Sequence, residues 1–175
     1  MSLTPPVGPR DHARGDPHAA LTLVEYGDYQ CPYCGQAQMV VEGVEKLLGP
    51  KLRFVFRNFP LAQAHPHAPL AAEAAEAAGA QGKFWEMHDR LFLHQAELDP
   101  PSLVRHARYV GLDLPRFEAD LASHKFQPRV AEDFKSGVRS GVNGTPTFFV
   151  NGERYDGNWG SVRTFGAELL AALKR

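Results

Sequence analysis

The feature that most limits the fold of this sequence is a cysteine pair, Cys31 and Cys34, at a junction between two different hydrophobic patterns. Before the pair, Leu21 to Tyr26 is apolar and rich in β-branched and aromatic residues, which is typical of a strand buried on both faces. After it, apolar residues from Met39 to Leu48 recur at helical spacing until Gly49-Pro50 ends the run. The pair is therefore predicted between a core strand and a helix.

The segments that follow predict an α/β fold. Leu52 to Arg57 alternates in part and predicts a second strand, so the first third reads βαβ with a right-handed crossover and parallel strands. From His67 to Ser140 alanine and charged residues recur at helical periods and no strand pattern is found. The helices predicted there cover residues 68–80, 84–92, 101–109, 115–122 and 129–138.

The end of the chain returns to a β pattern. Thr147 to Val150 predicts a strand, Asn151-Gly152 a two-residue hairpin turn, and Arg154-Tyr155 the returning strand. Ser161 then predicts the N-cap of a final helix. We therefore expect a core made of residues 18–64 and 141–175, interrupted by an inserted helical domain at 65–140.

The first seventeen residues mix prolines and glycines with charged side chains, and we expect residues 1–17 to be a flexible N-terminal arm. The arm holds neither the apolar run of a signal peptide nor a span that could cross a bilayer, so no membrane partner is predicted. The missing signal-peptide pattern favours a cytoplasmic location. A chain trimmed to its mature form, periplasmic or otherwise extracytoplasmic, would look the same.

The charge balance argues against nucleic acid as a partner. The chain of 175 residues has 19 Lys and Arg against 20 Asp and Glu, and the basic residues are scattered along it. At 43% hydrophobic residues it can bury a full core without disulfide staples. The cysteine pair therefore calls for a chemical explanation.

A Cys-x-x-Cys at a helix start has a physical reason for its spacing, because the two sulfurs one turn apart lie on the same side. Pro32 suits the first helical turn, where its missing donor costs nothing. Unpaired amides and the positive dipole end favour the Cys31 thiolate, and pKa values of about 3.5 to 7 occur in such motifs against about 8.5 for a free cysteine. We expect Cys31 to be the nucleophile and Cys34 to resolve the mixed disulfide.

Two other interpretations of the pair stay open at this point. The cysteines could have fallen at this spacing, three positions apart, by accident, or they could be inert core residues. They could also form half of a zinc site, and among the eight histidines His65 and His67, next to the second strand, are candidate further ligands. The commoner role of such histidines is that of solvated residues at a helix start.

Glu25 lies in the middle of the apolar strand that leads to the pair. A carboxyl group buried there would have a raised pKa and could exchange protons with Cys34. The alternative is a glutamate at a strand edge that reaches water.

Several motifs in order resemble the DsbA-like branch of the thioredoxin superfamily. They are Val24-Glu25-Tyr26 with Cys31-Pro32-Tyr33-Cys34, then Arg57-Asn58-Phe59-Pro60-Leu61, then Gly141 to Phe148 with Gly144-Thr145-Pro146-Thr147 at its centre. The resemblance runs from about Ala19 to the C-terminus and places the helical insertion where that branch carries its helical domain.

The resemblance implies a thioredoxin-like fold with site residues at matching positions. Pro146 is expected to be cis and to pack against the cysteine pair, leaving the Thr145 backbone to pair with an extended substrate peptide. Pro32 and Tyr33 are assigned to the same substrate-binding surface, and Glu25 to the family's buried acidic position. The Pro-Tyr dipeptide differs from the Pro-His of strongly oxidising members and resembles glutaredoxins.

The sequence thus predicts a protein dithiol-disulfide oxidoreductase acting on cysteine-containing proteins, with no metal and no bound organic cofactor. Its redox partner is unidentified, with glutathione as one candidate. The alternatives are a glutathione-linked reductase, and a redox-inactive module that binds a peptide or zinc. The direction of exchange, oxidase, reductase or isomerase, is left open.

Overall fold

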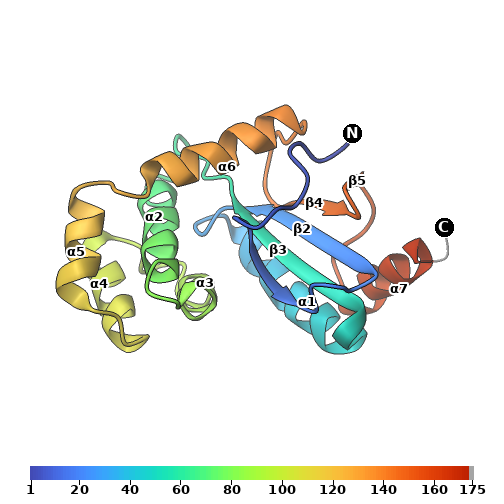
Figure 1. The fold of residues 1–175 in the computed structure, drawn as a ribbon, viewed down its shortest axis with the longest axis horizontal. Helices are drawn as coiled ribbons and strands as arrows, with labels where there is room; N and C mark the ends of the chain where they lie inside the picture. The colour runs from blue at the N-terminus through green and yellow to red at the C-terminus, as the bar shows by residue number, and fades with distance from the viewer. Residues whose placement is uncertain (174–175) are drawn as a thin grey trace.

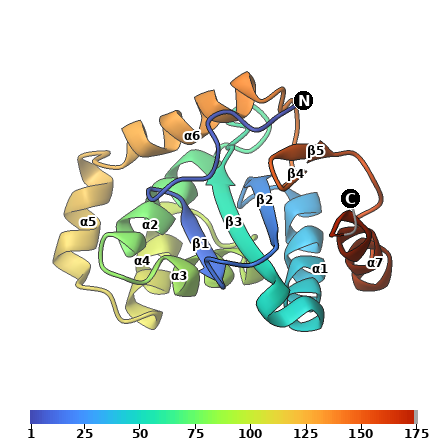
Figure 2. The ribbon, with the colours of Figure 1, turned by 45° about the vertical axis from the view of Figure 1, so that its right-hand side comes forward.

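The computed structural model describes residues 1–173, and at its centre is a five-stranded sheet in the order β1-β3-β2-β4-β5. Strands β2 (Leu21–Gly27) and β3 (Leu52–Asn58) run parallel, and α1 (Pro32–Leu48) with the short 3-10 helix η1 (Gly49–Lys51) connects them. The predicted βαβ unit is confirmed. Figure 2 shows α1 and α7 on the same side of this sheet.

The C-terminal part also forms as predicted. β4 (Thr147–Val150) pairs antiparallel with β2 and with β5 (Glu153–Tyr155). The turn between them places Asn151 and Gly152 at φ values of 49° and 85°, the left-handed region that an Asn-Gly turn requires. Helix α7 (Val162–Ala172) begins after Ser161, whose hydroxyl accepts a hydrogen bond from the Thr164 amide at 3.1 Å.

Five helices fill the segment between β3 and β4. They are α2 (Ala68–Gly79), α3 (Phe84–Leu93), α4 (Pro100–Tyr109), α5 (Leu114–Ala122) and α6 (Gln127–Arg139). Figure 1 shows them gathered beside the sheet, with α6 running back toward it. The α/β class and the thioredoxin-like architecture are confirmed, whereas the division into a core and an inserted domain stays a prediction.

The predicted flexible arm is wrong for much of its length. β1 (His12–Gly15) pairs antiparallel with β3 and forms one edge of the sheet. At the other edge the Leu3 amide donates to the Gly152 carbonyl at 2.7 Å. The prolines and glycines do interrupt local structure, but partners far along the chain hold this segment in place. Arg57, for example, is buried and donates from Nε to Asp11 at 2.7 Å.

The N-terminal chain also covers one face of the sheet. Leu3 packs there into an apolar cluster that contains Val24, Tyr26, Val55 and Phe149. The larger cluster lies on the opposite face beneath α1, α7 and the helical segment, and it contains both cysteines.

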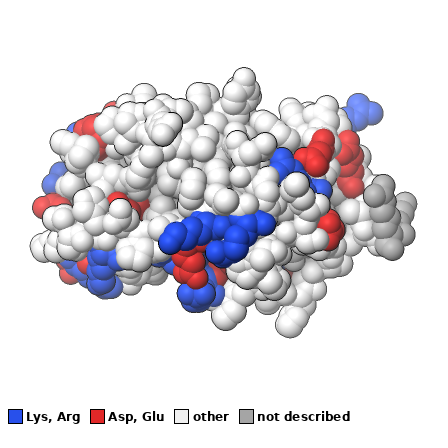
Figure 3. Space-filling model, turned by 90° about the horizontal axis from the view of Figure 1, so that it is seen from above, with Lys and Arg blue, Asp and Glu red and all other residues white. Residues whose placement is uncertain are grey.

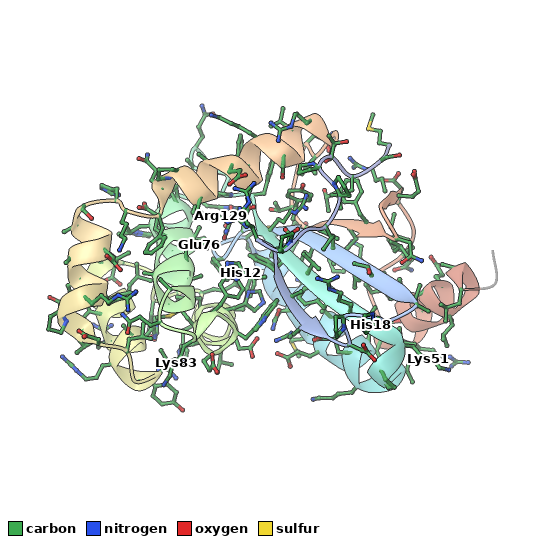
Figure 4. The ribbon with its side chains drawn as sticks, viewed as in Figure 1. His12, His18, Lys51, Glu76, Lys83 and Arg129 are labelled. Carbon is green, nitrogen blue, oxygen red and sulfur yellow. The ribbon has the colours of Figure 1, made fainter. Side chains whose placement is uncertain are left out.

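A buried polar cluster joins the helical segment to the sheet. His12 from β1 lies 2.9 Å from Glu76 of α2, and Asn58 at the end of β3 donates to Glu76 at 2.8 Å. Asn58 also donates to Asp133 of α6, which pairs with Arg129. Figure 4 shows His12, Glu76 and Arg129 converging from β1, α2 and α6. These bonds connect β3, α2 and α6 at the end of the sheet nearest the helices.

Charged side chains on the face over α6 are few, and basic ones lie beside acidic ones (Figure 3). Arg10 and Glu132 form one such pair, at 2.6 Å. In residues 1–173, no helix combines the length and the apolar character needed to span a bilayer.

Candidate active site

The cysteine pair lies at the start of α1, as the sequence predicts. Cys31 is the N-cap residue, with extended backbone angles, and Pro32 occupies the first helical turn. Cys31 is 4% exposed and Cys34 is fully buried, and both are free thiols. The sulfur nearest to solvent is therefore that of Cys31, whereas Cys34 is enclosed by the core.

The surroundings of Cys31 favour its ionised form. A hydrogen bond from the Cys34 thiol is the largest cause that lowers the pKa of Cys31, to about 5, and it outweighs the opposing effect of burial. The side chain of Thr145 and the backbone amides of Cys34 and Tyr33 lower it further. The amides are those of a helix start, which agrees with the sequence argument.

Cys34 behaves in the opposite way. Burial raises the pKa of its thiol well above the ordinary value, and the hydrogen bond to Cys31 and the charge of Glu25 raise it further. The two cysteines of one motif therefore differ widely in acidity. One is a thiolate at neutral pH and the other keeps its proton.

Glu25 is completely buried, so the alternative of a glutamate at a strand edge is wrong. Its residue lies between Phe56 of β3 and Phe148 of β4 in the sheet register, and neither carboxyl oxygen has a hydrogen-bond partner in the structure. Burial raises the pKa of this carboxyl group to about 8, against a lowering by the charge of Arg14. At neutral pH it is mostly protonated.

The Thr145-Pro146 peptide bond is cis, as the resemblance implies. It precedes β4 and brings the Thr145 carbonyl oxygen within 3.5 Å of the Cys31 sulfur. The Thr145 hydroxyl is buried and has no hydrogen-bond partner in the structure. Its lowering effect on the pKa of Cys31 follows because this hydroxyl can donate to the thiolate.

Pro32 and Tyr33 lie on the outside of the site. Both are exposed, and 63% of Tyr33 is open to solvent. Their exposure next to Cys31 leaves them accessible to another molecule that approaches the sulfur.

Sequence reasoning missed Asp28, which precedes Cys31 by three residues. Its carboxylate is buried and accepts hydrogen bonds from the amides of Gln30 and Leu61, both at 2.8 Å, and of Cys31, at 3.1 Å. Its position directly after a strand and before a helix was the available signal, because aspartate often binds nearby amides in such turns.

Gln95 was also missed. It follows α3, and its side-chain amide donates to the carbonyls of Tyr29 at 2.9 Å and Cys31 at 2.8 Å. Gly35 leaves the space it needs, because a side chain at that position would collide with the Gln95 amide. Nothing in the sequence around Gln95 indicates this role, since its partners lie 64 and 66 residues away.

The two candidate zinc ligands have separate surroundings. His65 donates from Nδ1 to Asp28 at 2.8 Å, so its expected role as a solvated helix-start residue is wrong, whereas His67 is exposed. In the part of the chain that the structure describes, no three His, Cys, Asp or Glu side chains are grouped so that they could hold a metal ion. The donor arrangement therefore does not support the zinc interpretation.

The fold has known counterparts. A family model described as Thioredoxin matches residues 8–164. A thioredoxin-like oxidoreductase from Silicibacter pomeroyi superposes with a TM-score of 0.83 at 30% identity, over 96% of this chain and 95% of that one. Oxidised BdbD from Bacillus subtilis gives 0.84 at 24% identity, over 94% of each chain. The alpha-DsbA1 protein from Wolbachia pipientis gives 0.82 at 20% identity, over 97% of this chain and 93% of that one.

Curated relatives of this chain are much longer proteins. Na(+)/H(+) antiporter NhaA 1 of Salinispora arenicola is 51% identical over 176 residues, which is 99% of this chain and 26% of the antiporter. NhaA 3 of Salinispora tropica is 48% identical over the same shares. The chain spans about a quarter of the length of these relatives.

Proposed function

Because the chain belongs to the thioredoxin family and has the DsbA-like arrangement of its fold, we propose that it is a thiol:disulfide oxidoreductase that exchanges disulfides with cysteine-containing proteins. Cys31 is the nucleophile and Cys34 the resolving cysteine. The relative from Silicibacter pomeroyi, at 30% identity, is described as a thioredoxin-like oxidoreductase, which supports this class.

The observation that carries the proposal is the opposite acidity of the two cysteines. The pKa of Cys31 is lowered to about 5, so at neutral pH its sulfur is a thiolate and a good leaving group. The pKa of Cys34 is raised, so its thiol is held in reserve. This asymmetry is what a two-step exchange through the sulfur nearer to solvent requires.

In the oxidising direction, a substrate thiolate attacks the Cys31 sulfur of the Cys31–Cys34 disulfide. A substrate–Cys31 disulfide forms, the bond between the two cysteines breaks, and Cys34 leaves as a thiolate that takes up a proton. A second substrate thiolate then attacks the substrate sulfur of the mixed disulfide. The substrate leaves with a disulfide, and Cys31 leaves as a thiolate, so two electrons have passed to the cysteine pair.

Glu25 is the proposed proton donor and acceptor for Cys34. Its pKa of about 8 lets the carboxyl group give a proton to the departing Cys34 thiolate and take it back in the reverse step. The raising effect of the Glu25 charge on the pKa of Cys34 supports an electrostatic interaction between the two groups. An unchanged exchange rate across pH in a Glu25→Gln variant would remove this role.

The substrate surface is proposed around the exposed residues next to Cys31. The contact between the Thr145 carbonyl and the Cys31 sulfur supports a site at which an extended peptide carrying a cysteine could pair with this backbone. Pro146 shapes this segment, and Pro32 and Tyr33 provide exposed contact area. Recognition through the main chain would accept many substrate sequences.

We propose that the favoured direction is donation of disulfides. A stabilised Cys31 thiolate stabilises the reduced enzyme, which makes its disulfide a stronger oxidant. Disulfides persist in oxidising compartments, so this direction fits the periplasmic or extracytoplasmic alternative better than the cytoplasm. The antiporters share only 26% of their length with this chain, and their transport activity is not carried over to it.

Equilibration in glutathione buffers, followed by acid quench and thiol alkylation, tests the proposal. We expect a reversible two-electron transition between Cys31 and Cys34 with a potential nearer to about −120 mV than to about −230 mV. A potential at or below about −230 mV would make the protein a reductase. Failure of the pair to form a disulfide at any ratio would contradict an oxidoreductase function.

A further inference from the structure

We propose that Asp28 and His65 form a positioning pair for Cys31, in which Asp28 fixes the Cys31 backbone and His65, acting through Asp28, offsets the carboxylate charge beside the nucleophile. The inference deepens the proposed function and rests on it. Neither residue is in the Cys-x-x-Cys motif, and they come from two different connections of the fold.

The Asp28 carboxylate is fully enclosed, with 0% of its side chain exposed, and its two oxygens face different partners. Oδ1 accepts hydrogen bonds from the amides of Gln30 at 2.8 Å and Cys31 at 3.1 Å. Oδ2 accepts from the amide of Leu61 and from His65 Nδ1, both at 2.8 Å. The carboxylate thus connects the loop before Cys31 to the loop after β3.

This arrangement exceeds what a local turn needs. An aspartate that only shapes a turn binds amides one to three residues ahead, as Oδ1 does here. Oδ2 instead binds groups 33 and 37 residues away, on a loop that leads into α2. Both oxygens of this buried side chain therefore have hydrogen-bond donors, from two different loops.

A buried negative charge on this loop affects the redox chemistry of Cys31. The amide that Oδ1 binds belongs to Cys31, the residue that must carry a thiolate, and a carboxylate held against this residue's backbone opposes a second negative charge on its side chain. A donor on the far oxygen draws charge away from Cys31. His65 is that donor, and 19% of its side chain is exposed, so solvent reaches it as well.

Other groups also face the Cys31 sulfur and set the baseline for the test. Cys34 comes from α1, Thr145 from the segment before β4, and the Glu25 charge acts from β2 through Cys34. None of these is altered in the variants below. Changes at Cys31 can therefore be assigned to the Asp28–His65 pair.

The experiment compares His65→Ala, Asp28→Asn and the double variant with the wild-type protein. His65→Ala removes the donor on Oδ2, so we expect the Cys31 thiolate to be less stable, with a pKa about 0.5 higher and a disulfide about threefold easier to form. Asp28→Asn removes the charge but keeps one acceptor oxygen for the two loop amides. We expect shifts of similar size in the opposite direction.

Two readouts are needed: the equilibrium constant of the cysteine pair with glutathione, and the pH profile of Cys31 alkylation in the reduced protein. The double variant should match Asp28→Asn, because His65 acts only through the carboxylate. The matched control is His67→Ala, an exposed histidine two residues along the same loop, which should leave both readouts at wild-type values.

The inference is overturned if the variants change thermal stability but leave both readouts within experimental error of wild type, or if the two single effects add in the double variant. If Asp28→Asn does not fold, His65→Ala and its control still give the answer. If the wild-type pair forms no disulfide, the proposed function fails, whereas the alkylation profile of the reduced protein still tests the positioning pair.

Discussion

Two buried carboxyl groups, Glu25 and Asp28, precede the cysteine pair in the chain, and their hydrogen-bond surroundings are opposite. Glu25, within β2, is fully buried and has no hydrogen-bond partner in the structure. Asp28, in the loop before Cys31, is equally buried but accepts hydrogen bonds from three backbone amides and one histidine. The first is suited to hold a proton, and the second to hold the loop before Cys31 in place.

The difference arises from where each residue falls in the fold. The middle of a central strand offers no free amides, because the neighbouring strands use them in the sheet. The loop after the strand has amides that no ladder uses, and a short acidic side chain collects them. The proposed roles of the two carboxyl groups, proton transfer for Glu25 and positioning for Asp28, follow from this difference in surroundings.

The largest expected effect comes from replacing Glu25, the carboxyl group that has no hydrogen-bond donor. The pKa of Glu25 is raised from 4.5 to about 8 in the folded protein. Between these pH values the folded protein therefore keeps a proton on Glu25 that the unfolded chain has lost. Stability is thus lost as pH rises from about 4.5 to about 8. At pH 7 this penalty is on the order of 3 kcal/mol, and a Glu25→Gln variant escapes it.

Urea unfolding as a function of pH measures this effect, in a Cys31→Ser background so that the thiolate does not titrate. We expect the difference in unfolding free energy between Glu25→Gln and Glu25 to grow from pH 4.5 to 8 and then to level off. A difference that stays constant over that range would mean that Glu25 is ionised in the folded state, and the contrast with Asp28 would be lost.

A smaller effect is expected at Gln95. Its side chain donates to carbonyls of the loop before Cys31, whereas Asp28 accepts from amides of the same loop. Gln95→Ala leaves the Tyr29 and Cys31 carbonyls without this donor, which should cost about 1–2 kcal/mol of unfolding free energy. Gln127→Ala, an exposed glutamine on α6, is the control. The equilibrium constant with glutathione should change less than in Asp28→Asn. An equal change would mean that loop rigidity, and not the carboxylate charge, controls Cys31.

The parts of this molecule that could be predicted from sequence are those set by local patterns. The strand at 21–27, the hairpin at Asn151-Gly152 and the helix start at Pro32 each follow from residues within a few positions. The burial of Glu25 follows in the same way, because apolar neighbours surround it along the strand. The cysteine pair was found because its chemistry depends on spacing alone.

What could not be predicted depends on contacts between distant segments. β1 looked like part of a flexible arm because its pairing with β3 is decided about forty residues further along the chain. Gln95 meets Cys31, and His65 meets Asp28, only after the helical segment has folded back on the sheet. No short-range pattern around these residues distinguishes them from other polar surface side chains.

The most direct test of the account is the alkylation of each cysteine in the reduced protein as a function of pH, with the modified residue identified by mass spectrometry. The account predicts that Cys31 reacts with a midpoint at about pH 5, whereas Cys34 stays unmodified to well above pH 9. If both cysteines titrate together near the ordinary value of about 8.5, the asymmetry that carries the proposed function is absent.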